Sequence, residues 1–263
     1  MARQAKLIKK LTSLIRKLNC REFLHHFGPK KYKLVQHLTA LLFMQIAKLS
    51  FRRVSYLLMM LGLNVPSYSA LCKGRKRIPL SLWNSVLKLT HSESSNVAID
   101  STGISYLNPS FHYIKRIDRK KPIKSYVKLS VFFDIDQRKF IALRVRAKPR
   151  HDTKDFDYLF NQNHSFEKLY ADSGYDSEKI YEKCYDKGIQ TFIKPKKNIH
   201  RGFYRKKQFK NYSEEEYHQR SLVEAGFSSI KRKYGSYTLT RGHNSARAEL
   251  YLRAIAHNLS LSP

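Results

Sequence analysis

The strongest constraint on the fold is a series of short apolar strands and helices that begins near residue 96. Residues 126–133 and 139–146 are rich in Val, Phe, Ile and Leu, and turn-forming residues join them, which predicts a β-hairpin. Further elements are predicted as strands at 96–100, 168–172 and 190–193 and as helices at 154–161, 177–187 and 213–234. Strands alternating with helices in this order predict a mixed α/β sheet with helices on its faces.

The preceding residues have a different pattern and predict a separate helical region. Apolar residues recur at helical spacing, as in Leu34, Leu38, Leu41, Leu42 and Ile46. We therefore divide the chain into a helical region, residues 1–92, and an α/β domain, residues 93–263.

Within the helical region, residues 50–77 resemble a helix-turn-helix. Ser50 is a suitable N-cap for a first helix, and Asn64-Val65-Pro66 breaks it. The second helix carries the candidate DNA-contacting residues Tyr68, Lys73, Arg75 and Lys76. In a helix-turn-helix this second helix lies in the major groove of DNA. The alternative is an ordinary basic pair of helices that touches only backbone phosphates.

The charge of the chain limits its partners. It carries 51 Lys and Arg against 20 Asp and Glu, a formal net charge of +31. So unbalanced a surface repels itself unless a polyanion neutralises it, which favours DNA or RNA, with an anionic membrane as the main rival. The sequence contains no apolar run of membrane-spanning length and no apolar signal-peptide core, and its three cysteines are widely spaced. We expect a cytoplasmic, nucleoid-associated protein without a membrane partner.

Two aspartates end apolar strands of the predicted sheet. Asp100 follows Asn96-Val-Ala-Ile and Asp172 follows Lys168-Leu-Tyr-Ala, and small or turn-forming residues come after each. A single aspartate at the end of a strand is often only a turn cap. Two carboxylates at the carboxyl ends of neighbouring strands, however, converge at the edge of an α/β sheet, where sites usually form.

The last predicted helix carries a third acid among cations. Tyr217, Arg220, Glu224 and Lys231 fall on one stripe of the helix, roughly 60° wide at about 100° per residue. Taken alone, Glu224 could be one half of an ordinary i,i+4 ion pair with Arg220. Together with Asp100 and Asp172, it completes a set of three oxygen donors that suits Mg²⁺ or Mn²⁺. Two such ions can activate a water or a 3′-hydroxyl and stabilise the leaving oxygen of a phosphodiester.

These residues resemble a known family. Val-Ala-Ile-Asp100-Ser-Thr-Gly, Tyr-Ala-Asp172-Ser-Gly-Tyr-Asp and Tyr217-x2-Arg220-x3-Glu224-x6-Lys231 are similar to the three motifs of DDE transposases of prokaryotic insertion sequences, in particular the group with a Tyr-Arg-Glu-Lys signature. The resemblance covers most of residues 50–260.

The resemblance implies a fold, a reaction and roles for individual residues. It implies a ribonuclease-H-like domain in which Asp100, Asp172 and Glu224 bind two Mg²⁺ ions, whose place Mn²⁺ can take. It implies cleavage at transposon ends and transfer of the 3′ ends into target DNA, with Tyr217, Arg220 and Lys231 positioning the terminal DNA. It further implies a helix-turn-helix that reads the terminal inverted repeats of double-stranded DNA, and a homodimer on paired ends.

Two rivals remain open from the sequence: an inactive or repurposed copy that only binds DNA, and a ribonuclease-H-like nuclease that cuts without joining. Other acidic residues have structural interpretations that we prefer. His151-Asp152 could form a metal or acid–base pair, but we prefer a loop residue followed by a helix N-cap at Asp152 or Thr153, and Asp134 and Asp136 belong to a hairpin turn.

Overall fold

The computed structural model describes residues 9, 11–18, 20–24, 30–106, 126–148, 150–162, 165–196, 201–240 and 242–261. It divides into two compact units, one formed by residues 1–90 and 247–263 and the other by residues 91–246. The first boundary lies beside the one expected at 92. The last seventeen residues, which we had placed in the α/β domain, group instead with the N-terminal unit.

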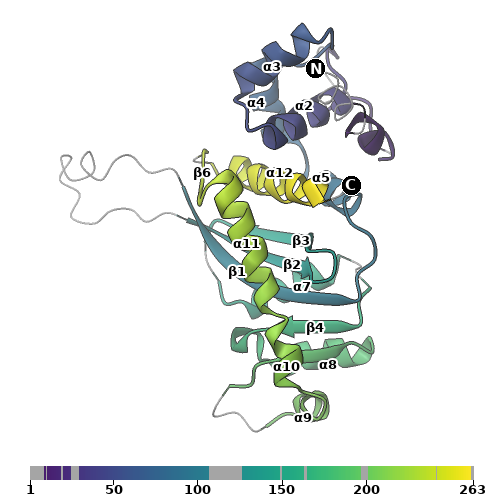
Figure 1. Ribbon diagram of the computed structural model, residues 1–263, viewed down its shortest axis with the longest axis vertical. Helices are drawn as coiled ribbons and strands as arrows, with labels where there is room; N and C mark the ends of the chain where they lie inside the picture. The colour runs from purple at the N-terminus through teal and green to yellow at the C-terminus, as the bar shows by residue number, and fades with distance from the viewer. Residues whose placement is uncertain are drawn as a thin grey trace, which may run out of the picture. The chain divides into compact units, whose positions relative to one another are not determined.

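The N-terminal unit is helical. Its helices, labelled in Figure 1, are α2 Leu34–Ile46, α3 Phe51–Met60, α4 Tyr68–Arg77 and α5 Leu80–Lys88, together with the greater part of α12 His243–Leu261. Ser50 caps α3 by accepting a hydrogen bond from the amide of Arg53, and Ser67 caps α4 in the same way through Ala70. The two consecutive helices predicted at 50–77 are therefore present, and α2 packs against both.

Helices α2 and α3 carry the longest apolar stretch. Among the described residues, no single helix is long and apolar enough to cross a membrane. Taken together, α2 and α3 have the length and composition for it, but the pair is bent by 112° at its junction. Most of α2 is buried within its unit.

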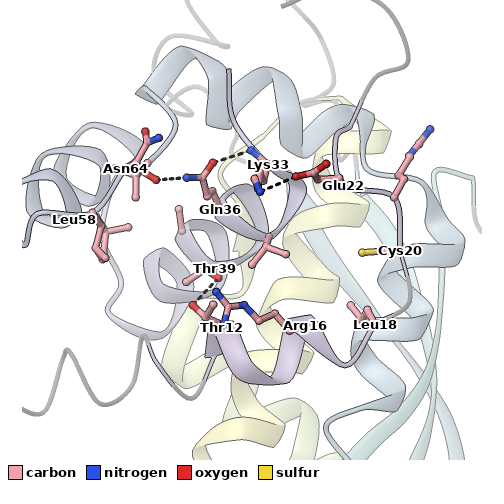
Figure 2. A pocket seen from close by; sticks show the side chains of 15 residues that line it. Thr12, Arg16, Leu18, Cys20, Glu22, Lys33, Gln36, Thr39, Leu58 and Asn64 are labelled. Carbon is pink, nitrogen blue, oxygen red and sulfur yellow. Dashed lines mark hydrogen bonds and ion pairs between the residues drawn. The ribbon is translucent and has the colours of Figure 1, made fainter. Parts of the chain in front are cut away.

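A pocket of about 530 Å³ opens beside α2 in the same unit. Figure 2 shows polar groups on its wall: Lys33 is paired with Glu22 across 2.7 Å, and Gln36 donates to the carbonyl of Asn64 across 2.7 Å. These polar side chains already have bonding partners within the protein.

The second unit contains the sheet. Its strands are β1 Asn96–Tyr106, β2 Tyr126–Asp134, β3 Lys139–Arg146, β4 Lys168–Ala171, β5 Gln190–Ile193 and β6 Tyr237–Thr238. The order is β3-β2-β1-β4-β5, with β1, β2 and β3 antiparallel and β4 and β5 parallel to β1, while β6 pairs with the far end of β1. This mixed sheet confirms the predicted ribonuclease-H-like α/β class, including the hairpin, and β4 ends directly before Asp172. The strand expected at 96–100 does not end at Asp100 but continues to Tyr106 along its partner β2.

Helices cover both faces of the sheet. The remaining elements of the unit are α7 Thr153–Phe160, the short 3₁₀ turn η1 Ser173–Tyr175, α8 Glu178–Asp186, α9 Phe203–Phe209, α10 Glu214–His218 and α11 Ser221–Tyr234. Val97 and Ile99 of β1 pack in one core cluster with residues of α7 and α8. Alternate residues of a strand face opposite sides, so Asp100 and Thr102 point to the other face, which α11 crosses (Figure 1).

Gly226 allows α11 to lie close to the sheet. A Cβ at this position would come 2.6 Å from the ring of Phe133 in β2. Since real Cβ atoms do not approach so closely, any larger residue would push α11 away from the strands. The close contact fixes the height of the helix that carries Glu224 above the sheet.

The predicted helix 213–234 is interrupted. α10 ends at His218 and α11 begins at Ser221, and the amides of Gln219, Arg220, Leu222 and Val223 bond to carbonyls three residues earlier. This tighter turn changes the angular spacing between Tyr217 and the residues of α11. Glu216 accounts for the position of α10, since it accepts hydrogen bonds from Lys168 and Tyr170 of β4.

Candidate active site

Asp100 and Asp172 are neighbours at the point where the parallel pairing of β1 and β4 ends. β1 and β4 pair up to Ile99 and Ala171, and the two aspartates are the next residues on their strands. Asp172 also begins η1, where its Oδ1 accepts a hydrogen bond of 2.9 Å from the amide of Gly174. The two aspartates are therefore adjacent, as expected, although Asp100 lies within β1 and not at its end.

Asp100 is more buried than Glu224: its side chain is 17% exposed, whereas that of Glu224 is 56% exposed. Its pKa is raised to about 6, mainly by burial and in part by the negative charges of Asp172 and Glu224. The amide of Ser101, 2.7 Å from Oδ1, and the guanidinium of Arg220 act in the opposite direction. That both other acids influence Asp100 places the three carboxylates in one electrostatic neighbourhood.

Glu224 is brought to this neighbourhood by Arg220. The guanidinium donates to Asp100 Oδ2 across 3.2 Å and to Glu224 Oε1 across 2.6 Å. The i,i+4 ion pair that the sequence allowed as the simpler interpretation is thus present, but the same arginine also reaches across to β1. Because Arg220 stands at the tight turn before α11, it can bond to the helix and the strand together.

Lys231 and Tyr217 lie on either side of that arginine along the chain. Lys231 Nζ donates to Thr102 Oγ1 of β1 across 2.7 Å. The Arg220 guanidinium lies 6.0 Å from the centroid of the Tyr217 ring. The structure therefore joins the four residues of the predicted stripe to β1 through Asp100 and Thr102.

Asp100, Asp172 and Glu224 do not converge closely on one point. Among the residues that the structure describes, no three His, Cys, Asp or Glu side chains stand close enough together to hold a metal as they are. Arg220 takes the place of a cation between Asp100 and Glu224. Even so, the donor set fits a hard divalent cation: three carboxylates, one of them with a pKa raised by burial and by its acidic neighbours.

Sequence reasoning missed the position of Asp152. We interpreted it as the N-cap of α7, and it does occupy that position, but its side chain makes no capping hydrogen bond. It bonds instead to Ser101, the residue after Asp100, and to Lys128 of β2. This contact depends on which residues the sheet brings together, so no local sequence signal could reveal it.

Asp134 and Asp136 make local hydrogen bonds at the hairpin, as expected. Asp134 accepts a hydrogen bond from the amide of Gln137 in its own turn and another from Ser94. Asp136 accepts from the side chain of Asn96. Both carboxylates serve the local structure at the opposite end of β1 from Asp100.

The candidate DNA-contacting residues of α4 belong to the other unit and divide into two groups. Tyr68 is 50% exposed, and Lys73 and Lys76 are exposed as well. Arg75, in contrast, is 5% exposed and lies 4.9 Å from the ring of Phe51. Its burial in the helical core argues against the DNA contact that we had assigned to it.

A comparison with protein families matches most of the α/β unit to one family. Residues 91–259 match the family model described as a transposase DDE domain. No curated protein matches the chain. Among solved structures, a chain of the cryo-EM structure of a piggyBac transposase synaptic complex with hairpin DNA is similar at 12% identity and a TM-score of 0.47, over 98% of this chain and 73% of that one.

Proposed function

Because the chain belongs to the family of transposases with a DDE domain, we propose that it cleaves phosphodiester bonds at transposon ends and transfers the 3′ ends into target DNA. The observation that supports the proposal is that Asp100 and Asp172 are neighbours on paired strands and that Arg220 links Asp100 to Glu224. The Tyr217-Arg220-Glu224-Lys231 spacing supports the narrower assignment to the prokaryotic insertion-sequence group.

We assign the three carboxylates as the ligands of two Mg²⁺ ions, which Mn²⁺ can replace. When bound, such ions supply activation of a water or 3′-hydroxyl and stabilisation of the leaving oxygen. Members of the family generally use divalent metals. In this assignment the sheet supplies two of the ligands, Asp100 and Asp172, and α11 supplies the third, Glu224.

Arg220, Lys231 and Tyr217 then hold the DNA beside the carboxylates. Arg220 must leave Asp100 and Glu224 when a metal enters, and its guanidinium is suited to bidentate contact with a phosphate. Lys231, placed over β1 by Thr102, adds a second phosphate contact, and the ring of Tyr217 lies against the arginine. The same side chains would thus neutralise the acids in the free protein and the DNA in the complex.

The N-terminal helices would recognise the terminal inverted repeats of double-stranded DNA. Tyr68, Lys73 and Lys76 of α4 are exposed and suited to this contact, and the net charge of +31 favours a polyanionic partner. Pairing of two ends favours a homodimer on DNA. We place this activity in the cytoplasm, on the nucleoid.

The test is a cleavage and joining reaction. The purified protein is incubated with its flanking inverted-repeat DNA and Mg²⁺, and wild type is compared with Glu224→Gln. We expect free 3′-hydroxyl ends and joined products with wild type only. Equal cleavage by the two proteins would remove Glu224 from the catalytic set.

Two other outcomes would favour the rival functions. Binding without cleavage by the folded wild-type protein would favour an inactive copy that acts as a DNA-binding protein. Free 3′ ends that never join a target would favour a nuclease without strand transfer.

A further inference from the structure

Asp152 is attached to the strand that carries Asp100. Its Oδ1 accepts a hydrogen bond of 2.7 Å from the hydroxyl of Ser101 and lies 2.6 Å from Lys128 Nζ. Although burial acts against it, the hydrogen bonds from Lys128 and Ser101 lower the pKa of Asp152. Asp152 is therefore held directly beside the residue that follows Asp100.

The second oxygen of Asp152 faces Asp172 across Gly174. A Cβ at position 174 would lie 3.3 Å from Asp152 Oδ2 and 2.9 Å from Asp172 Oδ1. The two carboxylates thus border one small space, which stays open only because residue 174 has no side chain. The backbone of Gly174 has no need of a left-handed conformation, so the space itself is the reason for glycine here.

A buried hydroxyl points to the same place. Tyr175 is 1% exposed, and within the described part of the chain its hydroxyl has no hydrogen-bond partner. Tyr175 ends the short turn η1 that Asp172 begins, and its amide donates to the carbonyl of Asp172 across 3.1 Å. A buried hydroxyl without a partner is unfavourable, so this one indicates a ligand with which it bonds.

We propose that Asp152 is a fourth carboxylate of the metal site, and that Tyr175 donates its hydroxyl to an oxygen bound with the metal. The inference rests on the proposed function and deepens it, because it adds α7 and η1 to the elements that hold the divalent cation. Lys128 and Ser101 both hold Oδ1 of Asp152, which leaves Oδ2 for the cation or its waters.

Metal binding by the full chain without DNA tests this inference. Mn²⁺ is titrated and the free ion is followed by electron paramagnetic resonance, for wild type and for Asp152→Asn, which keeps an acceptor for Ser101. We expect affinity to fall by about 10-fold or more, the usual effect of losing such a partner. Asp157→Asn is the matched control, because Asp157 lies on the same helix but pairs with Lys179 and Lys183. It should bind Mn²⁺ as wild type does.

Two further variants keep the test decisive if Asp152→Asn does not fold. Gly174→Ala leaves every carboxylate in place but puts a methyl group between Asp152 and Asp172, so it should weaken Mn²⁺ binding as well. Tyr175→Phe should raise the melting temperature of the metal-free protein, since it removes an unpartnered hydroxyl, and should reduce the additional stabilisation that Mn²⁺ gives. A purely structural hydroxyl would not show this opposite pair of effects.

The Mn²⁺ titrations distinguish failure of the fourth-carboxylate inference from failure of the proposed function. If Asp152→Asn and Gly174→Ala bind Mn²⁺ as wild type does while Asp100→Asn and Asp172→Asn lose it, the fourth carboxylate is wrong and the proposed site stands. If all four variants bind Mn²⁺ as wild type does, both the fourth carboxylate and the proposed metal site are wrong.

Discussion

Arg220 joins Asp100 of β1 to Glu224 of α11 through one guanidinium, 3.2 Å from the first carboxylate and 2.6 Å from the second. The side chain of Arg220 is 20% exposed, so these contacts are only partly screened by water. In the protein without metal, the cation that balances two of the three acids is therefore an arginine.

Removing that arginine should strengthen metal binding and weaken DNA binding. Arg220→Ala leaves Asp100 and Glu224 without a competing cation, so we expect Mn²⁺ to bind the DNA-free protein several-fold more tightly. Cleavage should fall because a phosphate contact is lost. Mn²⁺ titration and a cleavage assay measure the two effects, with Arg232→Ala, an exposed change on the same helix, as control. Unchanged or weaker Mn²⁺ binding would show that Arg220 does not compete with the metal.

The raised pKa of Asp100 predicts a pH-dependent cost to stability. A carboxyl whose pKa rises from 3.8 to about 6 on folding binds its proton more tightly in the folded state, so stability falls as pH rises through that window. Asp100→Asn should therefore increase the free energy of unfolding at pH 8 by up to about 3 kcal/mol, with little change near pH 4.

Denaturant unfolding without metal, at both pH values, measures this difference. Glu224→Gln is the control, since the side chain of Glu224 is 56% exposed and should show little pH-dependent gain. Added Mg²⁺ should stabilise wild type and not Asp100→Asn. A gain for Asp100→Asn that is equal at both pH values would contradict the electrostatic origin.

Much of this site could be predicted from the sequence, because its signals are local. Asp100 and Asp172 each follow an apolar strand, and the Tyr217-to-Lys231 spacing is contained in one segment. The role of Arg220 as a bridge could not be predicted, since it depends on the tight turn between α10 and α11. Asp152 was assigned a helix cap because its real partners, Ser101 and Lys128, come from other strands.

For the fold too, local features could be predicted from the sequence, whereas packing between distant segments could not. The hairpin, the strand that ends before Asp172 and the cap Ser50 follow from residue pattern and turn chemistry. Arg75 was assigned to DNA because it lies among basic residues, whereas packing places its side chain beside Phe51. Which face of a short basic helix is buried depends on its neighbours, and the sequence of α4 alone does not contain that information.

Two basic residues of α4 should therefore respond differently to mutation. Arg75→Ala should lower the free energy of unfolding by about 1–3 kcal/mol, because it removes a buried side chain that packs on Phe51. Lys76→Ala should leave stability unchanged and weaken binding to inverted-repeat DNA. Thermal melting and fluorescence anisotropy separate the two effects. If Arg75→Ala melts as wild type does but loses DNA binding, the side chain contacts DNA after all.

Lys231 should contribute one phosphate contact to the complex. Lys231→Met removes the charge but keeps an apolar stem, so affinity for terminal DNA should fall equally for any sequence, and the dependence of log affinity on log salt should lose about 1 from its slope. Anisotropy titrations over a range of salt concentrations measure the slope. Lys179→Met, on α8 and paired with Asp157, is the control. An unchanged slope would mean that Lys231 only anchors α11 to Thr102.

The contact between Gly226 and Phe133 should set the position of the helix that carries Glu224. Gly226→Ala places a methyl group 2.6 Å from the Phe133 ring, so α11 or the ring must move. We expect a loss of about 1–3 kcal/mol in stability and reduced cleavage, although no charged residue has changed.

Phe133→Leu alone should leave a small cavity. Combined with Gly226→Ala, it should recover part of both losses, because the shorter side chain makes room for the methyl group. Unfolding and cleavage measured on the two single variants and the double variant give the coupling between the positions. Strictly additive losses would show that the spacing between α11 and the sheet does not depend on this contact.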